Sequence, residues 1–178
     1  MTANSRDQLL GLALEVLRSG GTVSLDSVAR QAGLTKPGLM HHFRTKEALM
    51  LALVDHVIDC WERELADRLP GPLAEAPAHE RIRAYFDLAL SGTADEADLV
   101  MLADPRLRRQ LTARWKERLG PWVELPADLP PGERARLTAV RLLADGAWFA
   151  DATRTFALDD DERARVRALA REMLEDRA

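Results

Sequence analysis

Two short helices joined by a glycine turn constrain the fold of this chain more than any other feature of its sequence. The stretch SLDSVARQAGLTKPGLMHHFRTKEAL, residues 24–49, predicts a first helix over about residues 24–32. Gly33 then supplies the turn, because a residue that ends a helix commonly needs a positive φ, which glycine adopts without steric cost. Thr35 offers a hydroxyl to cap a second helix, and Pro37 lies in the first turn, where a missing N–H costs nothing.

The spacing of the small and apolar residues in this stretch is that of a helix-turn-helix motif. Ala29 is small, Gly33 follows four positions later and Leu39 six beyond that, so the second helix would be the one that reads a DNA groove. Leu39 and Phe43 are expected to point inward from it. On these residues alone, a plain packing corner of an all-helical domain remains an alternative.

The turn and the segment after it carry a connected set of residues: Gly33-Leu34-Thr35-Lys36, Leu39, His42-Phe43 and Lys46-Glu47-Ala48-Leu49. This set resembles the N-terminal domain of the tetracycline-repressor (TetR) family of bacterial transcription regulators, over roughly residues 5–53. The resemblance implies an all-α fold of about nine helices, with a three-helix DNA-binding domain over 1–46 and a helical effector-binding and dimerisation domain over 47–178. The residues expected to contact DNA are Ser24, Thr35, Lys36, Pro37, Gly38, Met40, His41, His42 and Lys46.

Two residues of the expected reading helix depart from the family pattern. Met40 stands where the family usually has tyrosine, so a phenol contact to DNA is absent. Gly38 stands where threonine, serine or alanine is more usual, and glycine destabilises a helix by about 1 kcal/mol relative to alanine. Because glycine also lets a base edge or a phosphate approach the backbone closely, we expect the reading helix to become firm only on DNA.

The charge of the chain is divided between its two parts. The 178 residues have a net charge of −4, but residues 1–46 carry six basic and three acidic residues, a net charge of +3, which leaves −7 for the remainder. A basic N-terminal module on an acidic body would confine attraction for a polyanion to one end. Uneven solvated surface charge without a function is the alternative.

Further helices are expected along the rest of the chain, separated by glycine and proline. The run Pro70-Gly71-Pro72 ends one of them, and Pro105 divides two helices within residues 94–119. A loop is predicted by four further prolines: Pro121, Pro126, Pro130 and Pro131. The other expected helices span about residues 5–19, 45–69, 78–90, 132–156 and 160–176.

The last two expected helices are candidates for a dimer interface. The first carries a stripe of small residues, which permits close approach of another helix, and the second begins with an acidic segment, Asp159 to Glu162, that resembles a capping box. An intrachain hairpin is the alternative, but the TetR resemblance favours a four-helix bundle of two chains that holds two reading helices one DNA turn apart. The expected interface residues are Ala139, Val140, Leu143, Ala144, Ala147, Val166, Leu169, Ala170 and Met173.

Most of the aromatic residues lie outside the expected DNA-binding domain. An aromatic and methionine-lined cleft with a few polar groups is typical of sites for drug-sized ligands, although a helical core has the same composition. The family resemblance implies that an effector releases the protein from DNA through a shift of the helix at 45–69. The residues expected to bind it are Tyr85, Phe86, Met101, Arg109, Trp115, Asp145 and Trp148.

Other functional classes find no support in the sequence. The four histidines and the single Cys60 lack partners at metal-ligand spacing, and no glycine loop for phosphates occurs, so we expect neither an enzyme nor a metal or cofactor. Charges in the first 20 residues and a longest apolar run of only residues 48–54 predict a cytoplasmic protein without a membrane partner.

The sequence therefore predicts a homodimeric repressor that binds a palindromic operator in double-stranded DNA and is released by a small apolar or amphiphilic effector. The alternative is a helical ligand-binding or interaction module with weak or no specific DNA binding.

Overall fold

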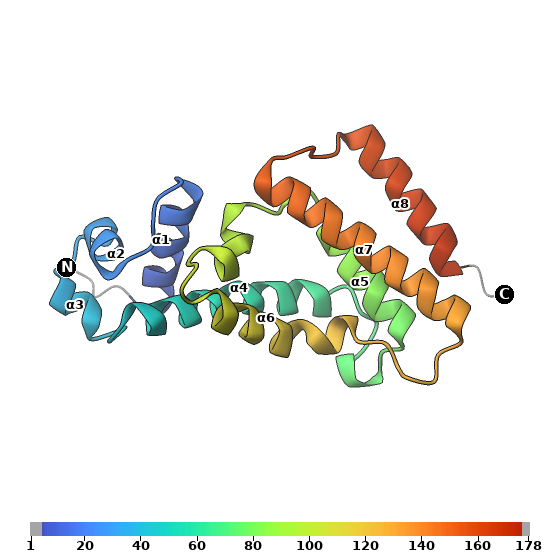
Figure 1. Cartoon of the computed structure of the whole chain (residues 1–178), viewed down its shortest axis with the longest axis horizontal. Helices are drawn as coiled ribbons and strands as arrows, with labels where there is room; N and C mark the ends of the chain where they lie inside the picture. The colour runs from blue at the N-terminus through green and yellow to red at the C-terminus, as the bar shows by residue number, and fades with distance from the viewer. Residues whose placement is uncertain (1–4, 176–178) are drawn as a thin grey trace. The chain divides into compact units, whose positions relative to one another are not determined.

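A computed structural model describes residues 5–175 of the chain, and this part is all-helical, as predicted (Figure 1). It contains eight α-helices and two short 3-10 helices. In chain order they are α1 (Arg6–Arg18), α2 (Leu25–Gln31), α3 (Lys36–Met40), α4 (Lys46–Ala66), η1 (Leu73–Glu75), α5 (Ala78–Ala89), η2 (Glu96–Leu102), α6 (Arg108–Val123), α7 (Pro131–Thr153) and α8 (Asp160–Glu175).

Local sequence signals account for where several helices begin and end. Gly20 follows α1 with a φ of 72°, a conformation that favours glycine. The Thr45 hydroxyl accepts the N–H of Ala48 at 3.1 Å and so caps α4. At the start of α8, Asp159 and Glu162 accept each other's backbone N–H, which confirms the capping box expected there.

Pro121 does not belong to the loop predicted for it from the sequence. It lies inside the last turn of α6, which continues to Val123. Helix ends leave carbonyl oxygens without partners, and here the Arg81 guanidinium donates to the oxygens of both Pro121 and Glu124. These bonds stabilise the end of α6 and offset the backbone hydrogen bond that proline lacks.

The described residues form two compact units that do not follow a single cut in the sequence. The first unit combines the residues up to Cys60 with Asp95–Arg118, and the second combines Trp61–Ala94 with the residues from Leu119 onward. The predicted division into 1–46 and 47–178 is one of function and stays a prediction. By packing, residues 95–118 lie with the N-terminal helices, although Asp95 comes 35 positions after Cys60 in the sequence.

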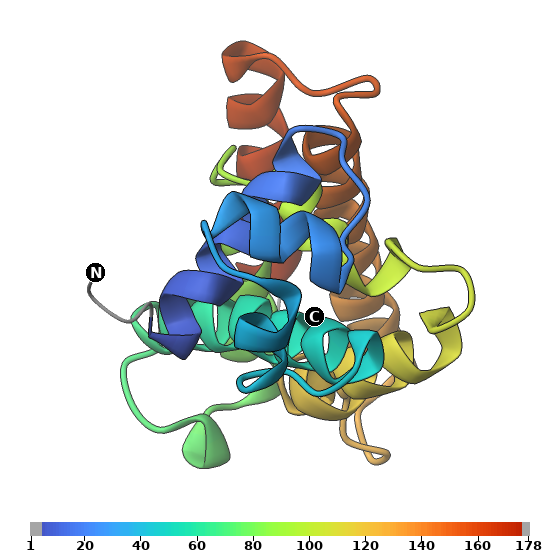
Figure 2. The ribbon, with the colours of Figure 1, turned by 90° about the vertical axis from the view of Figure 1, so that its left-hand side faces the viewer.

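The first unit is built around α1, α2, α3 and the N-terminal part of α4. Contacts join α1 to α2, α2 to α3, and α1 to η2, and α3 lies beside the first turns of α4 in both views (Figures 1 and 2). Its core contains Leu9, Ala13, Val28, Leu39, Phe43, Leu49 and Leu53, each at most 1% exposed. This core holds the helix-turn-helix segment against the rest of the unit.

The second unit packs α7 against α5, and α8 against both, with α7 and α8 forming an antiparallel hairpin (Figure 1). Four of the residues expected at a dimer interface, Val140, Ala144, Ala147 and Ala170, are buried within the chain at 7% exposure or less. The prediction that these four residues contact a partner chain is wrong, because the small-residue stripe faces the chain's own helices. Leu169 is exposed, and the remaining four are half-buried: Ala139, Leu143, Val166 and Met173.

Candidate nucleic-acid interface

The turn between α2 and α3 has the hydrogen bonds that end a helix in a left-handed residue. Gly33 has a φ of 65°. Its N–H donates to the Arg30 oxygen at 3.2 Å, and the N–H of Leu34 donates to the Ala29 oxygen at 2.8 Å. This pair of bonds is the Schellman motif, and it fixes the direction in which the chain leaves α2.

The second helix of the motif is short and has stabilising contacts at both ends. Thr35 caps α3, because its hydroxyl accepts the N–H of Gly38 at 3.2 Å. Leu39 is fully buried and Phe43 is 1% exposed, as expected for the inward face. The helix ends at Met40, so Phe43 anchors the turn after α3 rather than the helix itself, and the guanidinium of Arg6 lies 5.1 Å from the centre of its ring.

The outer side of α3 and its following turn is open to solvent. Lys36, Pro37, Met40, His41 and His42 are all exposed, and Met40 keeps 40% of its surface. A fixed helix with a buried face and an exposed polar face is what insertion into a DNA major groove requires.

The other residues expected at DNA serve first as local structure. Ser24 caps α2 by accepting the N–H of Ser27 at 3.0 Å, and its hydroxyl also lies 3.0 Å from the hydroxyl of Ser27. At Gly38, an added Cβ would lie 3.3 Å from the Thr35 hydroxyl oxygen. Glycine therefore leaves room for the threonine cap, a role that adds to the close backbone approach inferred from the sequence.

Both lysines expected at DNA form ion pairs with carboxylates of the first unit. Lys36 Nζ lies 2.9 Å from Asp26 Oδ2, and both side chains are half or more exposed. Lys46 Nζ lies 2.5 Å from Asp104 Oδ2, and the Asp104 side chain is only 11% exposed. The hydrogen bond from Lys46 is the largest of the causes that hold the pKa of Asp104 below its ordinary value.

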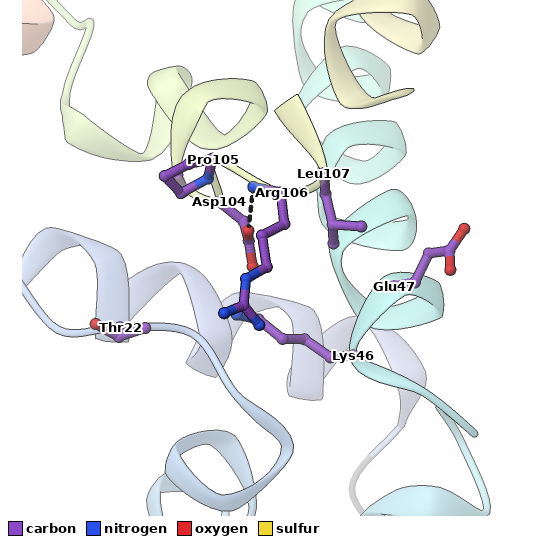
Figure 3. Close-up of a pocket in the computed structure, with 8 residues that line it drawn as sticks. Thr22, Lys46, Glu47, Asp104, Pro105, Arg106 and Leu107 are labelled. Carbon is purple, nitrogen blue, oxygen red and sulfur yellow. Dashed lines mark hydrogen bonds and ion pairs between the residues drawn. The ribbon is translucent and has the colours of Figure 1, made fainter. Parts of the chain in front are cut away.

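The Lys46–Asp104 pair lies in an open cavity of about 510 Å³ within the first unit. Figure 3 shows Lys46, Asp104 and Arg106 converging, whereas Glu47 points away from them. The Arg106 N–H donates to Asp104 Oδ1 at 2.8 Å, which closes the turn that leads into α6. The cavity is lined by Thr22, Lys46, Glu47 and residues 103–107.

The residues expected to bind an effector fall into both compact units. Met101, Arg109 and Trp115 belong to the first unit, whereas Tyr85, Phe86, Asp145 and Trp148 belong to the second. Within the second unit, the Tyr85 hydroxyl donates to Asp145 at 2.8 Å. Burial, followed by the charge of Asp145, raises the pKa of Tyr85 well above its ordinary value. The predicted set is thus only partly brought together, by the residues of α5 and α7.

Several residues of these two groups were not predicted from the sequence. Trp61 packs on Tyr85 and Trp148 with ring centres 5.9 Å apart in each case. Arg141 donates to Asp145 at 2.6 Å from one helical turn away, a spacing that the sequence does display. For Asp104 the sequence carries no signal, because its partner Lys46 is 58 positions distant.

Two features of other protein classes are absent from the described part of the chain. No group of three or more histidine, cysteine, aspartate or glutamate residues within 5–175 is arranged to hold a metal ion. No helix in the same range is both long and apolar enough to cross a membrane.

The chain has the features of a helix-turn-helix DNA-binding protein. Its reading helix α3 is capped, follows α1 and α2, and has an exposed outer face. The family model for bacterial regulatory proteins of the tetR family matches residues 9–53. The model for the tetracyclin repressor-like C-terminal domain matches residues 79–175, more than half of the chain. The chain therefore belongs to the TetR family of transcription regulators, which are not enzymes.

Solved structures show the same fold. A ketosteroid transcriptional regulator, KstR2 of Mycobacterium tuberculosis, is 21% identical with a TM-score of 0.58, and the match covers 96% of this chain and 94% of that one. A TetR/AcrR-family regulator from Thermobifida fusca YX-ER1 is 20% identical with a TM-score of 0.54, covering 97% and 98%. No curated protein sequence gives a significant match.

Proposed function

We propose that this TetR-family regulator is a homodimeric repressor that binds a palindromic operator and is released from it by a small apolar or amphiphilic effector. The observation that supports DNA binding is the exposed outer face of α3, whose inner face is anchored by the buried Leu39. Lys36, Pro37, His41 and His42 are the exposed side chains there that reach base edges, and Lys46 supplies a phosphate contact.

Two of the remaining expected contacts carry polar groups at the ends of the motif. The Thr35 hydroxyl uses an acceptor site for the Gly38 N–H, so its own hydrogen remains available to a phosphate oxygen. Ser24 lies at the start of α2 and is half-buried. Met40 offers an apolar contact to a thymine methyl group in place of a phenol.

The surface that supports dimerisation is an apolar face on the α7–α8 hairpin. Leu142 and Phe149 are two helical turns apart on α7 and are 56% and 49% exposed, and Leu169 on α8 is 52% exposed. Exposed leucine and phenylalanine on neighbouring helices are typical of surfaces that a partner covers. A two-fold axis through this face would give two reading helices and hence a palindromic site.

The group that supports effector binding in the second unit is the aromatic cluster of Trp61, Tyr85 and Trp148, with Asp145 as its polar member. Aromatic walls with one or two polar groups suit a ligand of mixed character. An effector releases DNA only if it prefers the form of the dimer that binds DNA poorly.

The DNA proposal is tested by fluorescence anisotropy with labelled duplexes from the region upstream of the chain's own coding sequence. We expect saturable binding of two chains to one palindromic segment, at lower protein concentration than to a shuffled duplex of the same composition. Equal affinity for the two duplexes would favour the alternative, a helical ligand-binding or interaction module.

Dimerisation is tested independently of DNA by light scattering. The wild type should have the mass of two chains at micromolar concentration. Replacing Phe149 by glutamate should give a folded monomer, because like charges would face each other across the axis. A wild-type protein that is monomeric under these conditions would refute the α7–α8 interface.

A further inference from the structure

The two lysines expected at DNA differ in the carboxylate that holds them. Lys36 pairs with Asp26 from the neighbouring helix, and the two side chains are 50% and 61% exposed. Lys46 pairs with Asp104, which comes from the turn between η2 and α6 and is 11% exposed at its side chain. An exposed local pair contributes little and exchanges easily with water. The second pair joins the start of α4 to a segment far along the chain.

Asp104 is placed so that its charge faces Lys46. Oδ1 accepts the Arg106 N–H at 2.8 Å and Oδ2 lies 2.5 Å from Lys46 Nζ. The backbone bond orients the carboxylate without help from the lysine. A carboxylate and a DNA phosphate are both anionic oxygen acceptors, so a lysine ammonium whose charge is already neutralised by Asp104 attracts a phosphate less strongly.

We propose that Asp104 is an internal competitor of the DNA backbone for Lys46, so that binding to DNA breaks the Lys46–Asp104 ion pair and frees the turn at 103–107 from the start of α4. This inference rests on the proposed contact between Lys46 and a DNA phosphate. It assigns Asp104 the role of a residue that sets DNA affinity without touching DNA.

The cavity around the pair makes the exchange reversible. After Lys46 leaves, Asp104 keeps its bond to the Arg106 N–H. The Arg106 guanidinium is exposed, has no acceptor among residues 5–175, and extends into the same cavity toward Lys46 (Figure 3). A second cation is therefore at hand, and the nearly buried carboxylate is not left without a counter-charge.

The test is a double-mutant cycle on DNA affinity, measured by anisotropy at moderate salt with the full chain. Asp104→Asn keeps an acceptor for the Arg106 N–H but removes the charge, so it should bind operator DNA about two- to fivefold more tightly, the range that partly exposed ion pairs give. Lys46→Ala should bind more weakly and lower the salt slope by about one. In the Lys46→Ala background, Asp104→Asn should change the affinity no more than removal of a negative charge elsewhere in the same segment does.

The matched control is Asp95→Asn. Asp95 also caps a helix of the same segment and also pairs with a basic residue, Arg18 at 2.7 Å, so it reports any general effect of removing a negative charge. The gain in DNA affinity from Asp104→Asn must exceed the gain from Asp95→Asn. If Asp104→Asn does not fold, Asp104→Ser is used in its place, because serine also offers a side-chain acceptor for the turn.

A second readout follows the turn itself. Operator DNA should speed amide hydrogen exchange at 103–107 in the wild type, whereas in Asp104→Asn exchange there should be fast already and unchanged by DNA. Asp104→Asn binding no more tightly than Asp95→Asn, or a gain that persists without Lys46, would overturn the inference. If Lys46→Ala binds DNA as tightly as the wild type does, the proposed contact between Lys46 and a phosphate fails as well. This outcome distinguishes failure of the DNA contact from failure of the role proposed for Asp104.

Discussion

The two compact units differ in the exposure of the ion pairs that join one helix or segment to another. In the first unit, ion pairs join its N-terminal helices to residues 95–118, and one or both partners remain partly exposed, as in Arg18–Asp95 and Arg114–Asp55. In the second unit, both terminal guanidinium nitrogens of Arg163 donate to Asp151 at 2.9 Å, and these side chains are only 12% and 7% exposed. The first arrangement suits contacts that exchange for a polyanion, and the second suits a fixed scaffold.

The Arg163 group joins three helices of the second unit. Besides Asp151 at the end of α7, Arg163 donates to the Leu158 oxygen at 3.3 Å. The neighbouring Arg167 donates to the Leu90 oxygen at 2.9 Å, just after α5. The bond to Leu90 satisfies a carbonyl oxygen that the end of α5 leaves without a partner, so the group fixes α8 to α5 and α7.

The largest effect is expected from breaking this buried pair. Arg163→Ala leaves Asp151 buried without a counter-charge and should lower the free energy of unfolding by about 3–5 kcal/mol, as measured by urea denaturation. The control is Arg165→Ala, whose pair with Asp161 is 79% and 87% exposed and whose loss should be close to neutral. Similar losses in the two variants would show that burial does not make the Arg163–Asp151 pair stronger than an exposed one.

A smaller effect is expected at the turn that orients the reading helix. Gly33→Ala places a side chain at a φ of 65° and should cost about 1–2 kcal/mol. No atom lies within 4 Å of the added Cβ, so the cost is one of backbone conformation. Gly11→Ala also meets nothing within 4 Å but lies inside α1, and it should stabilise by about 0.5–1 kcal/mol. A Gly33→Ala variant as stable as the wild type would show that the turn does not depend on glycine.

These local features could be predicted because each depends on residues within five positions. The glycine turn, the Thr35 cap and the capping box at Asp159 are fixed by side chains that bond to their own backbone neighbourhood. The exposed face of α3 followed from the same pattern.

Features that depend on contacts between elements distant in the sequence could not be predicted from local patterns. Helical periodicity identifies a small-residue stripe on α7 but not what covers it, so Ala144 and Ala147 were assigned to a partner chain when the chain's own helices bury them. Leu142 and Phe149 lie on the same helix, and nothing in the sequence distinguishes these exposed apolar residues from the buried ones. Asp104 was missed because an ion pair between distant residues leaves no spacing to detect.

A modest effect of pH is expected in the second unit. Burial and the Asp145 carboxylate raise the pKa of Tyr85 above its ordinary value near 10. Above that pH the unfolded chain loses the phenol proton while the folded chain keeps it, so stability that is present below about pH 10 falls as the pH rises. Tyr85 is the only tyrosine, and the near-ultraviolet absorbance of the phenolate therefore reports it alone.

Tyr85→Phe removes this titration. The variant should lose about 0.5–1.5 kcal/mol at neutral pH with the hydrogen bond to Asp145, and its stability should fall less steeply than that of the wild type between pH 9 and about 11. A phenolate signal that appears near pH 10 in the folded wild type would show that Tyr85 is not held as described.

The central claim, that the exposed face of α3 selects a DNA sequence, is tested most directly by the affinity of Lys36→Ala for the operator and for single-base variants of it. We expect Lys36→Ala to bind the operator more weakly and to discriminate less among the variants, by about 1–3 kcal/mol at the base that Lys36 contacts. The control is Arg108→Ala, an exposed cation at the start of α6, which should retain the wild-type order of preference. Identical affinities and preferences for the wild type and Lys36→Ala at moderate salt would contradict the claim.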